Sequence, residues 1–135
     1  MLLNKLPDRV LFTDVETTGL HSSDRIVSIG LILLDLARLR GGDATMSANH
    51  LVFDPGKKSH PRAEAVHGYS DWTLRHQETF ADYAPDLWQR FSGGTLTVAH
   101  NAPFDQSFIE REFRLVGHDG PPPLPAFFCT MEAYR

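Results

Sequence analysis

Residues 10–20 read VLFTDVETTGL, a short apolar run that ends in two acidic residues and a turn. Residues 10–14 have the composition of a buried strand, and residues 17–19 are turn-prone. Asp14 and Glu16 are two residues apart, and at that spacing side chains point to the same side of an extended chain. The stretch therefore predicts a first strand whose end directs two carboxylates toward one spot.

Two unpaired carboxylates at one spot repel each other and raise each other's pKa. A divalent cation removes that repulsion, and Mg²⁺ and Mn²⁺ accept oxygen ligands of this kind. An isolated Asp-x-Glu often arises by chance as a pair of solvated turn acids. The longer string, directly after a buried strand, is much more specific, and we predict that Asp14 and Glu16 are metal ligands.

A second string, LTVAHNAPFD at residues 96–105, combines an expected strand with an expected helix start. The helix begins near Asn101 or Ala102, with Pro103 in its first turn. Asp105 then lies among the free N–H groups of that turn, where an ionised carboxylate is favoured. A first-turn acid alone usually does no more than stabilise its helix. Together with the first string, it predicts a third metal ligand.

The rest of the chain fits one α/β domain. Strands expected at 26–34 and 49–53 continue the first strand into a three-strand antiparallel meander, with loops between them. An apolar stripe predicts a helix over 80–91, in which Pro85 either kinks the helix or moves its start. A second stripe continues the helix after Asn101 as far as Gly117. Further expectations are a stiff extended loop at 120–125 and a last strand at 127–131.

Composition limits the classes of protein. A chain of 135 residues suits a single domain, and a net charge of −4 gives no positive field to attract nucleic acid. Metal ions bound to acidic ligands would supply that charge instead. The single cysteine, Cys129, cannot form an internal disulfide, and the longest apolar stretch, 26–34, is too short to span a bilayer. We expect a soluble cytoplasmic protein that does not enter a membrane.

The two strings resemble the motifs of a known family. Residues 14–20 resemble the first motif of the DEDD 3′–5′ exonucleases, the family of the DNA polymerase III epsilon subunit and ribonuclease T, and residues 100–105 resemble the second. Residues 66–69, VHGY, resemble a short histidine-glycine segment that lies between them. From about Pro7 onward, the resemblance implies a ribonuclease H-like fold, a mixed sheet that begins with an antiparallel meander and is flanked by helices.

The resemblance also implies a mechanism. Two Mg²⁺ or Mn²⁺ ions, roughly 3.5–4 Å apart, would grip the scissile phosphate. Asp14, Glu16 and Asp105 would be the catalytic ligands. One ion would activate water and the other would stabilise the leaving 3′ oxygen, which releases nucleoside 5′-monophosphates from the 3′ ends of single-stranded DNA or RNA.

Substrate-binding roles follow from the same resemblance. Backbone groups after Glu16 would contact the terminal nucleotide, Leu20 would wedge beside its base, Phe104 would stack on base or sugar, and His67 and Asn101 would contact sugar or phosphate. Plain core packing is the alternative for Leu20 and Phe104, and an ordinary loop histidine is the alternative for His67. The predicted substrate-binding residues are Thr17, Thr18, Gly19, Leu20, His67, Asn101 and Phe104. A modest basic patch, Lys57, Lys58 and Arg62, either follows the backbone of the strand or is a solvated loop.

The third motif of the family, a histidine followed five residues later by an aspartate, is missing. After Asp105 only His118 and Asp119 occur, side by side before a proline-rich loop. We therefore expect 1–135 to be a single exonuclease-like domain that is truncated at its C-terminus and lacks its last helix. Alone it would be a weak or inactive enzyme, and it would self-associate through the apolar surface that this helix covers.

Two other functions stay open. The chain could be an inactive exonuclease-like module that binds nucleic acid or a DNA polymerase subunit, or, less well supported, a ribonuclease H-like endonuclease. The three intact carboxylates favour an enzyme, and the continuation at 17–20 argues by resemblance against the endonuclease. Nothing in the sequence chooses DNA over RNA.

Overall fold

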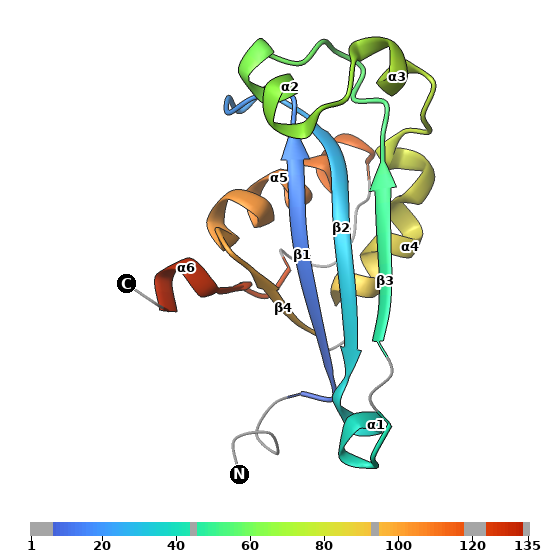
Figure 1. Cartoon of the computed structure of the whole chain (residues 1–135), viewed down its shortest axis with the longest axis vertical. Coiled ribbons are helices and arrows are strands. Elements are labelled where there is room, and N and C mark those ends of the chain that lie inside the picture. The colour runs from blue at the N-terminus through green and yellow to red at the C-terminus, as the bar shows by residue number, and fades with distance from the viewer. Residues whose placement is uncertain (1–6, 44–45, 93–94, 118–123, 134–135) are drawn as a thin grey trace.

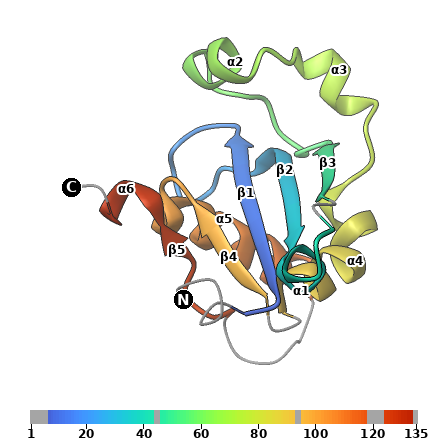
Figure 2. The same ribbon diagram turned by 60° about the horizontal axis from the view of Figure 1, so that its bottom comes forward.

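The computed structural model describes residues 7–43, 46–92, 95–117 and 124–133. They form one five-stranded sheet in the order β3-β2-β1-β4-β5, flanked by helices (Figures 1 and 2). The strands are β1 Arg9–Thr17, β2 Ile26–Asp35, β3 Met46–Val52, β4 Leu96–Ala99 and β5 Phe128–Cys129. The helices are α1 Leu36–Arg40, α2 Pro61–His67, α3 Asp71–Arg75, α4 Phe80–Ser92, α5 Ala102–Leu115 and α6 Thr130–Ala133.

The sheet is mixed. β1, β2 and β3 pair antiparallel, which confirms the predicted meander, and β4 runs parallel to β1 and β5 parallel to β4. Asp14 lies opposite Gly30 of β2, and Gly30 lies opposite His50 of β3. The central strand β1 therefore has an antiparallel neighbour on one side and a parallel neighbour on the other.

Helices α4 and α5 cover one face of this sheet, behind the strands in Figure 1. Leu11 and Val15 of β1 point into that core, where they meet Phe91 of α4 and Ile109 of α5. The even-numbered residues of β1, including Asp14 and Glu16, point to the opposite face, because side chains alternate along a strand. The same-side placement predicted for the two acids is confirmed.

The α4 helix follows its apolar stripe. Phe80 and Leu87 are buried in the core, and the Thr79 N–H and hydroxyl both donate to the Asp82 carboxylate, at 2.8 and 3.0 Å. The helix begins at Phe80, before Pro85, so the proline does not set its start. In α5, Asp105 lies in the first turn as predicted.

Three predictions about elements were wrong. The strand expected at 127–131 is only Phe128–Cys129, because β5 pairs with just two residues at the end of β4, and the chain turns into α6 from Thr130. Segments for which no helix was expected contain α1, α2 and α3, which have only five to seven residues and are too short to give an apolar stripe. Each is capped by a side chain, Asp35, His60 and Ser70 in turn. The third strand also begins earlier than expected, at Met46.

Residues 118–123, which hold most of the expected proline-rich loop, lie outside the described residues. Within the described part of the chain, no helix combines the length and apolar character needed to cross a membrane.

Candidate active site

Strand β1 is longer than its parallel neighbour, and this leaves part of its edge open. β4 pairs with β1 only as far as Phe12, whereas β1 continues to Thr17. Beyond β4 the Val15 N–H donates instead to Oδ2 of Asp105, at 3.2 Å. The helix that starts directly after β4 thus brings Asp105 beside the backbone that carries Asp14 and Glu16.

The three carboxylates influence one another. Asp105 is 4% exposed, and this burial, followed by the charge of Asp14, raises its pKa to about 7. The hydrogen bonds from the Val15 N–H and from its own N–H oppose the rise, and Glu16 adds to it. Burial and then the charge of Asp14 also raise the pKa of Glu16. Asp14 therefore lies close enough to Asp105 and Glu16 for its charge to disfavour the ionised forms of both.

Carboxylates in this arrangement fit a divalent cation. A buried acid whose pKa is raised by its neighbours loses its proton readily once a cation balances the charge. The donors are all oxygen, the kind that Mg²⁺ and Mn²⁺ accept. Across 7–43, 46–92, 95–117 and 124–133, however, no three histidine, cysteine, aspartate or glutamate side chains already surround one point in the way a bound ion requires.

A cleft of about 630 Å³ opens beside Glu16, between the loop that follows β1 and helix α2, which lies above the end of β1 in Figure 1. Its walls carry exposed apolar side chains, with Leu20 84% and Val66 74% exposed, and its rim carries basic ones. The lining residues are Val15, Glu16, Thr17, Gly19, Leu20, His21, Asp24, Lys57, Lys58, Ser59, His60, Arg62, Ala63, Val66 and Phe104.

Four predicted substrate-binding residues line this cleft: Thr17, Gly19, Leu20 and Phe104. Leu20 is too exposed to be a core residue, so the packing alternative for it fails. Phe104 does both, because it lines the cleft and its ring centroid lies 4.7 Å from that of Phe108. The basic patch of Lys57, Lys58 and Arg62 borders the same cleft.

Thr18 lies inside the loop and does not line the cleft. It is fully buried, and its hydroxyl donates to Asp24 Oδ1 at 2.8 Å. Its N–H donates to the Arg25 carbonyl at 2.9 Å, and its carbonyl accepts from the His60 N–H at 2.7 Å. With both backbone groups engaged inside the protein, Thr18 holds the loop in place.

His67 and Asn101 are also absent from the cleft lining. His67 Nδ1 accepts from the Tyr69 N–H at 3.0 Å, which leaves its Nε2 to donate to the Ser59 hydroxyl at 3.1 Å. Burial lowers the pKa of His67, against the opposing charges of Glu64 and Asp71. His67 thus ties α2 to the preceding loop, whereas Asn101 is exposed at the start of α5 and makes no side-chain cap bond.

Asp24 is a cleft residue that was not predicted from the sequence. In the sequence it is one of several polar residues in a turn, and the only indication of a role is its position between the first motif and the second expected strand. It is nevertheless buried, and a Cβ added at Gly19 would lie 2.4 Å from its Oδ2. Only glycine at position 19 allows that close approach.

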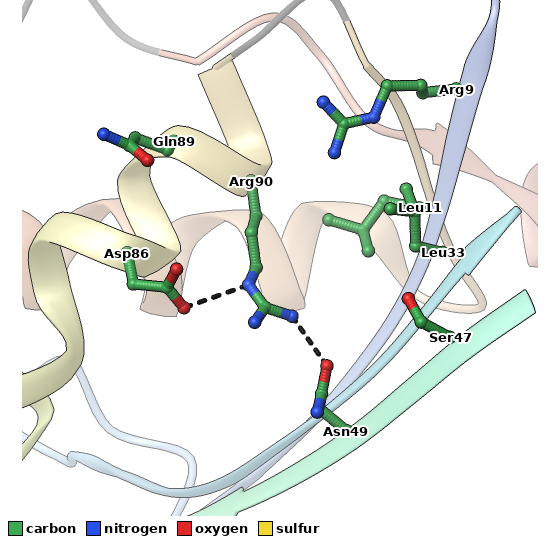
Figure 3. Close-up of a pocket in the computed structure, with 8 residues that line it drawn as sticks. All are labelled: Arg9, Leu11, Leu33, Ser47, Asn49, Asp86, Gln89 and Arg90. Atoms are coloured by element: carbon green, nitrogen blue, oxygen red, sulfur yellow. Dashed lines mark hydrogen bonds and ion pairs between the residues drawn. The ribbon is translucent and has the colours of Figure 1, made fainter. Parts of the chain in front are cut away.

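A second pocket, of about 470 Å³, lies between the sheet and α4 (Figure 3). Arg90 crosses it, donating to Asp86 at 3.0 Å and to Asn49 at 2.7 Å. None of the three candidate metal ligands lines this pocket. Arg90, Asp86 and Asn49 are engaged with one another, and we do not assign the reaction there.

Comparison with known proteins gives consistent matches. The RNase_T family model, described as exonuclease, matches residues 11–135. The DNA polymerase III subunit epsilon of Escherichia coli is 32% identical over 119 residues, which cover 84% of this chain and 46% of that protein. The chain thus spans less than half the length of the curated relatives it matches first.

Solved structures of exonuclease I share the fold. A product-bound form has a TM-score of 0.77 at 18% identity, over 94% of this chain and 31% of that one. A zinc-bound E. coli complex with single-stranded DNA has a TM-score of 0.67 at 21% identity, over 79% and 23%. The ribonuclease H-like α/β fold expected from the sequence is confirmed.

Proposed function

We propose, from the premise that this chain belongs to the RNase_T exonuclease family, that it forms the metal-binding part of a 3′–5′ exonuclease acting on single-stranded nucleic acid. Membership confirms the family predicted from the two sequence strings. The observation that carries the proposal is the contact of Asp105 with the Val15 N–H, on the strand that bears Asp14 and Glu16.

The ligands we assign to Mg²⁺ or Mn²⁺ are Asp14, Glu16 and Asp105. When bound, the ions would supply positive charge to the phosphate oxygens and lower the pKa of the attacking water. The residues of the chain hold the substrate for that step. Asp14 and Glu16 lie on the face of the sheet opposite to α4 and α5, and Asp105 lies in the first turn of α5. The three ligands therefore surround the edge of β1 that β4 leaves unpaired.

The cleft beside Glu16 is the place we assign to the 3′-terminal nucleotide. Leu20 and Phe104 offer apolar surface to a base, and the loop at Gly19 brings backbone close to it. Cleavage at the neighbouring phosphate would release a nucleoside 5′-monophosphate. Single-stranded DNA is the first substrate to test, because the names of the matched proteins include a DNA polymerase subunit and a complex with such DNA. RNA ends and a polymerase partner remain part of the proposal.

The test compares the wild-type chain with Asp14→Ala, and uses Asp86→Ala on the exposed side of α4 as the matched control. Mn²⁺ binding is measured by calorimetry, and turnover with a 5′-labelled single-stranded oligonucleotide. The wild type is expected to bind Mn²⁺ and to shorten the oligonucleotide slowly from its 3′ end. Turnover should be slow because the third motif is missing: the only histidine in 1–135 that is followed five residues later by an aspartate is His100, and that aspartate is Asp105 itself.

Asp14→Ala should lower Mn²⁺ affinity and turnover by at least about a hundredfold, whereas Asp86→Ala should change neither. Equal Mn²⁺ binding by the wild type and Asp14→Ala would refute the metal assignment. Internal cuts in place of a 3′ ladder would favour an endonuclease. If the wild type shows no turnover and Asp14→Ala still binds the oligonucleotide, the non-catalytic binding module is favoured. That alternative is compatible with the absence of a preformed cluster of three metal-ligating side chains in the described residues.

A further inference from the structure

Asp24 holds together three parts of the cleft. It lies in the connection between β1 and β2, 7% exposed. Its Oδ1 accepts the Thr18 hydroxyl at 2.8 Å and lies 3.0 Å from Lys57 Nζ. Its Oδ2 accepts the His21 N–H at 2.9 Å and packs against Gly19. One carboxylate therefore contacts the wall of the cleft and one of the cations on its rim.

Lys57 is held at that rim by two acceptors. It comes from the loop after β3, and its ammonium also donates to the Ser23 carbonyl at 3.4 Å. An ammonium has three N–H groups, so two acceptors leave one for a ligand. The side chain lines the cleft and stays 37% exposed. A free lysine loses rotamer entropy when it is fixed, and the contact with Asp24 removes part of that loss before a ligand arrives.

We propose that Asp24 is a positioning residue, which holds the Lys57 ammonium and the Gly19–Leu20 wall so that a phosphate of the bound strand meets the ammonium as its terminal base enters the cleft. The inference rests on the proposed function and names how the cleft recognises the backbone of its substrate. Asp24 itself touches no reacting atom.

A purely stabilising role explains these contacts less well. A half-exposed ion pair adds little stability, whereas burying a carboxylate costs free energy unless it is well bonded. Burial by itself raises the pKa of Asp24, but the hydrogen bonds from Lys57, Thr18 and the His21 N–H hold it below its ordinary value. Asp24 is therefore ionised, and it keeps its partners, at any pH at which a nuclease would work.

The experiment exploits a conflict between two expectations. Asp24→Asn removes a negative charge beside a cleft for a polyanion, and simple electrostatics predicts tighter binding. Positioning predicts weaker binding, because a neutral amide oxygen holds the ammonium less firmly than a carboxylate does. Binding of a fluorescent single-stranded oligonucleotide is measured by anisotropy with Ca²⁺ present, and the length of the oligonucleotide is checked afterwards. Lys57→Met tests the cation, and Lys58→Met, a cleft lysine for which the structure gives no contact with Asp24, is the matched control.

We expect Asp24→Asn and Lys57→Met each to weaken binding by about tenfold, the value of one charge-assisted hydrogen bond. The double variant should bind no more weakly than either single one. The effects of Lys58→Met and Asp24→Asn should be independent, so that the loss of affinity in their double variant is the product of the two single losses. Lys57→Met should also reduce the slope of log affinity against log salt by about 0.7, the value for one contact with a single strand. With Mn²⁺, Asp24→Asn should raise KM and leave kcat unchanged, whereas a merely structural loss would lower kcat through the active fraction.

Several results would overturn the inference. One is that Asp24→Asn binds the oligonucleotide as tightly as the wild type or more tightly. Another is that the effects of Asp24→Asn and Lys57→Met on affinity are independent of each other. If Asp24→Asn does not fold by circular dichroism, Lys57→Met decides alone, and unchanged affinity and salt slope refute the inference. A wild type that binds no oligonucleotide refutes the proposed function and this inference together. A wild type that binds, with variants that bind equally well, refutes the inference alone.

Discussion

At the scale of single residues, Asp105 is the most deeply buried of the three candidate metal ligands. It is almost completely buried, it accepts the Val15 N–H, and it faces the charges of two other acids. For an aspartate in that environment, ionisation costs free energy unless a cation balances the charge. We expect this cost to appear in the pH dependence of stability.

The pKa of Asp105 in the folded chain, about 7, lies above its ordinary value of 3.8. The native state therefore holds the proton more tightly, and the resulting stabilisation is complete below pH 4 and lost as the pH rises through 7. Without metal, the free energy of unfolding should fall between pH 5 and 8 by an Asp105 contribution on the order of 3 kcal/mol.

Urea titrations at several pH values measure this loss, with Asp105→Asn as the variant in which it should disappear and Asp86→Asn as the control in which it should remain. Mn²⁺ should stabilise the wild type more at pH 8 than at pH 6, because it competes with the proton. The same pH slope in the wild type and Asp105→Asn would contradict the raised pKa.

Among the elements, α5 links the candidate metal ligands to the cleft. Its first turn supplies Asp105, and its far half holds the start of β2. Glu112, 2% exposed, accepts Arg25 Nε at 2.7 Å and Nη2 at 2.9 Å, and also the Ile26 N–H at 3.2 Å. Arg111 donates to the Asp24 carbonyl at 3.0 Å. The helix therefore fixes the connection that carries Asp24 as well as the acid at its own start.

Removal of the Glu112 carboxylate should leave the partly buried Arg25 and the Ile26 N–H without their acceptor. We expect Glu112→Ala to lower the free energy of unfolding by about 3–5 kcal/mol, and Glu112→Gln to lower it less, because the amide still accepts a hydrogen bond. Asp86→Ala, which breaks the exposed pair with Arg90, should cost less than about 1 kcal/mol. Urea unfolding monitored by circular dichroism measures all three, and a loss within 1 kcal/mol for Glu112→Ala would show that the pair does not anchor the helix.

For the molecule as a whole, the two faces of the sheet differ. α4 and α5 cover one face, whereas α1 covers only one end of the other, around Val10 and Leu36. The register places Phe12, Ile32 and Phe128 in one row across that open face, and they are 42%, 43% and 50% exposed. An apolar row of this kind is a surface for association, and the self-association expected from the sequence remains a prediction.

Sedimentation equilibrium tests it. The chain should form larger species at high concentration, and Ile32→Thr should weaken that association by about tenfold. Leu115→Thr, which changes an exposed leucine at the end of α5, is the control and should have no effect. A monomer at every concentration, or equal association by both variants, would mean that the open face is not used in this way.

The elements that depend on local patterns could be predicted from the sequence. Strand β2 follows a continuous apolar run and helix α4 an apolar stripe of helical period, and alternation alone sets Asp14 and Glu16 on one side of β1. The short helices were not predictable in this way, because five to seven residues are too few to show an apolar period. β5 ended early because its partner strand ended, which no local pattern reveals.

By itself, the sequence determined the family and the meander and put forward the three acids as candidate ligands, because each depends on residue types at short spacings. Only the tertiary structure decided that β1 extends beyond the end of β4, that Asp105 accepts a hydrogen bond from a strand residue 90 positions earlier, and that Asp24 pairs with Lys57. The physical reason is that burial, pKa and ion pairing depend on what packing brings together from distant parts of the chain.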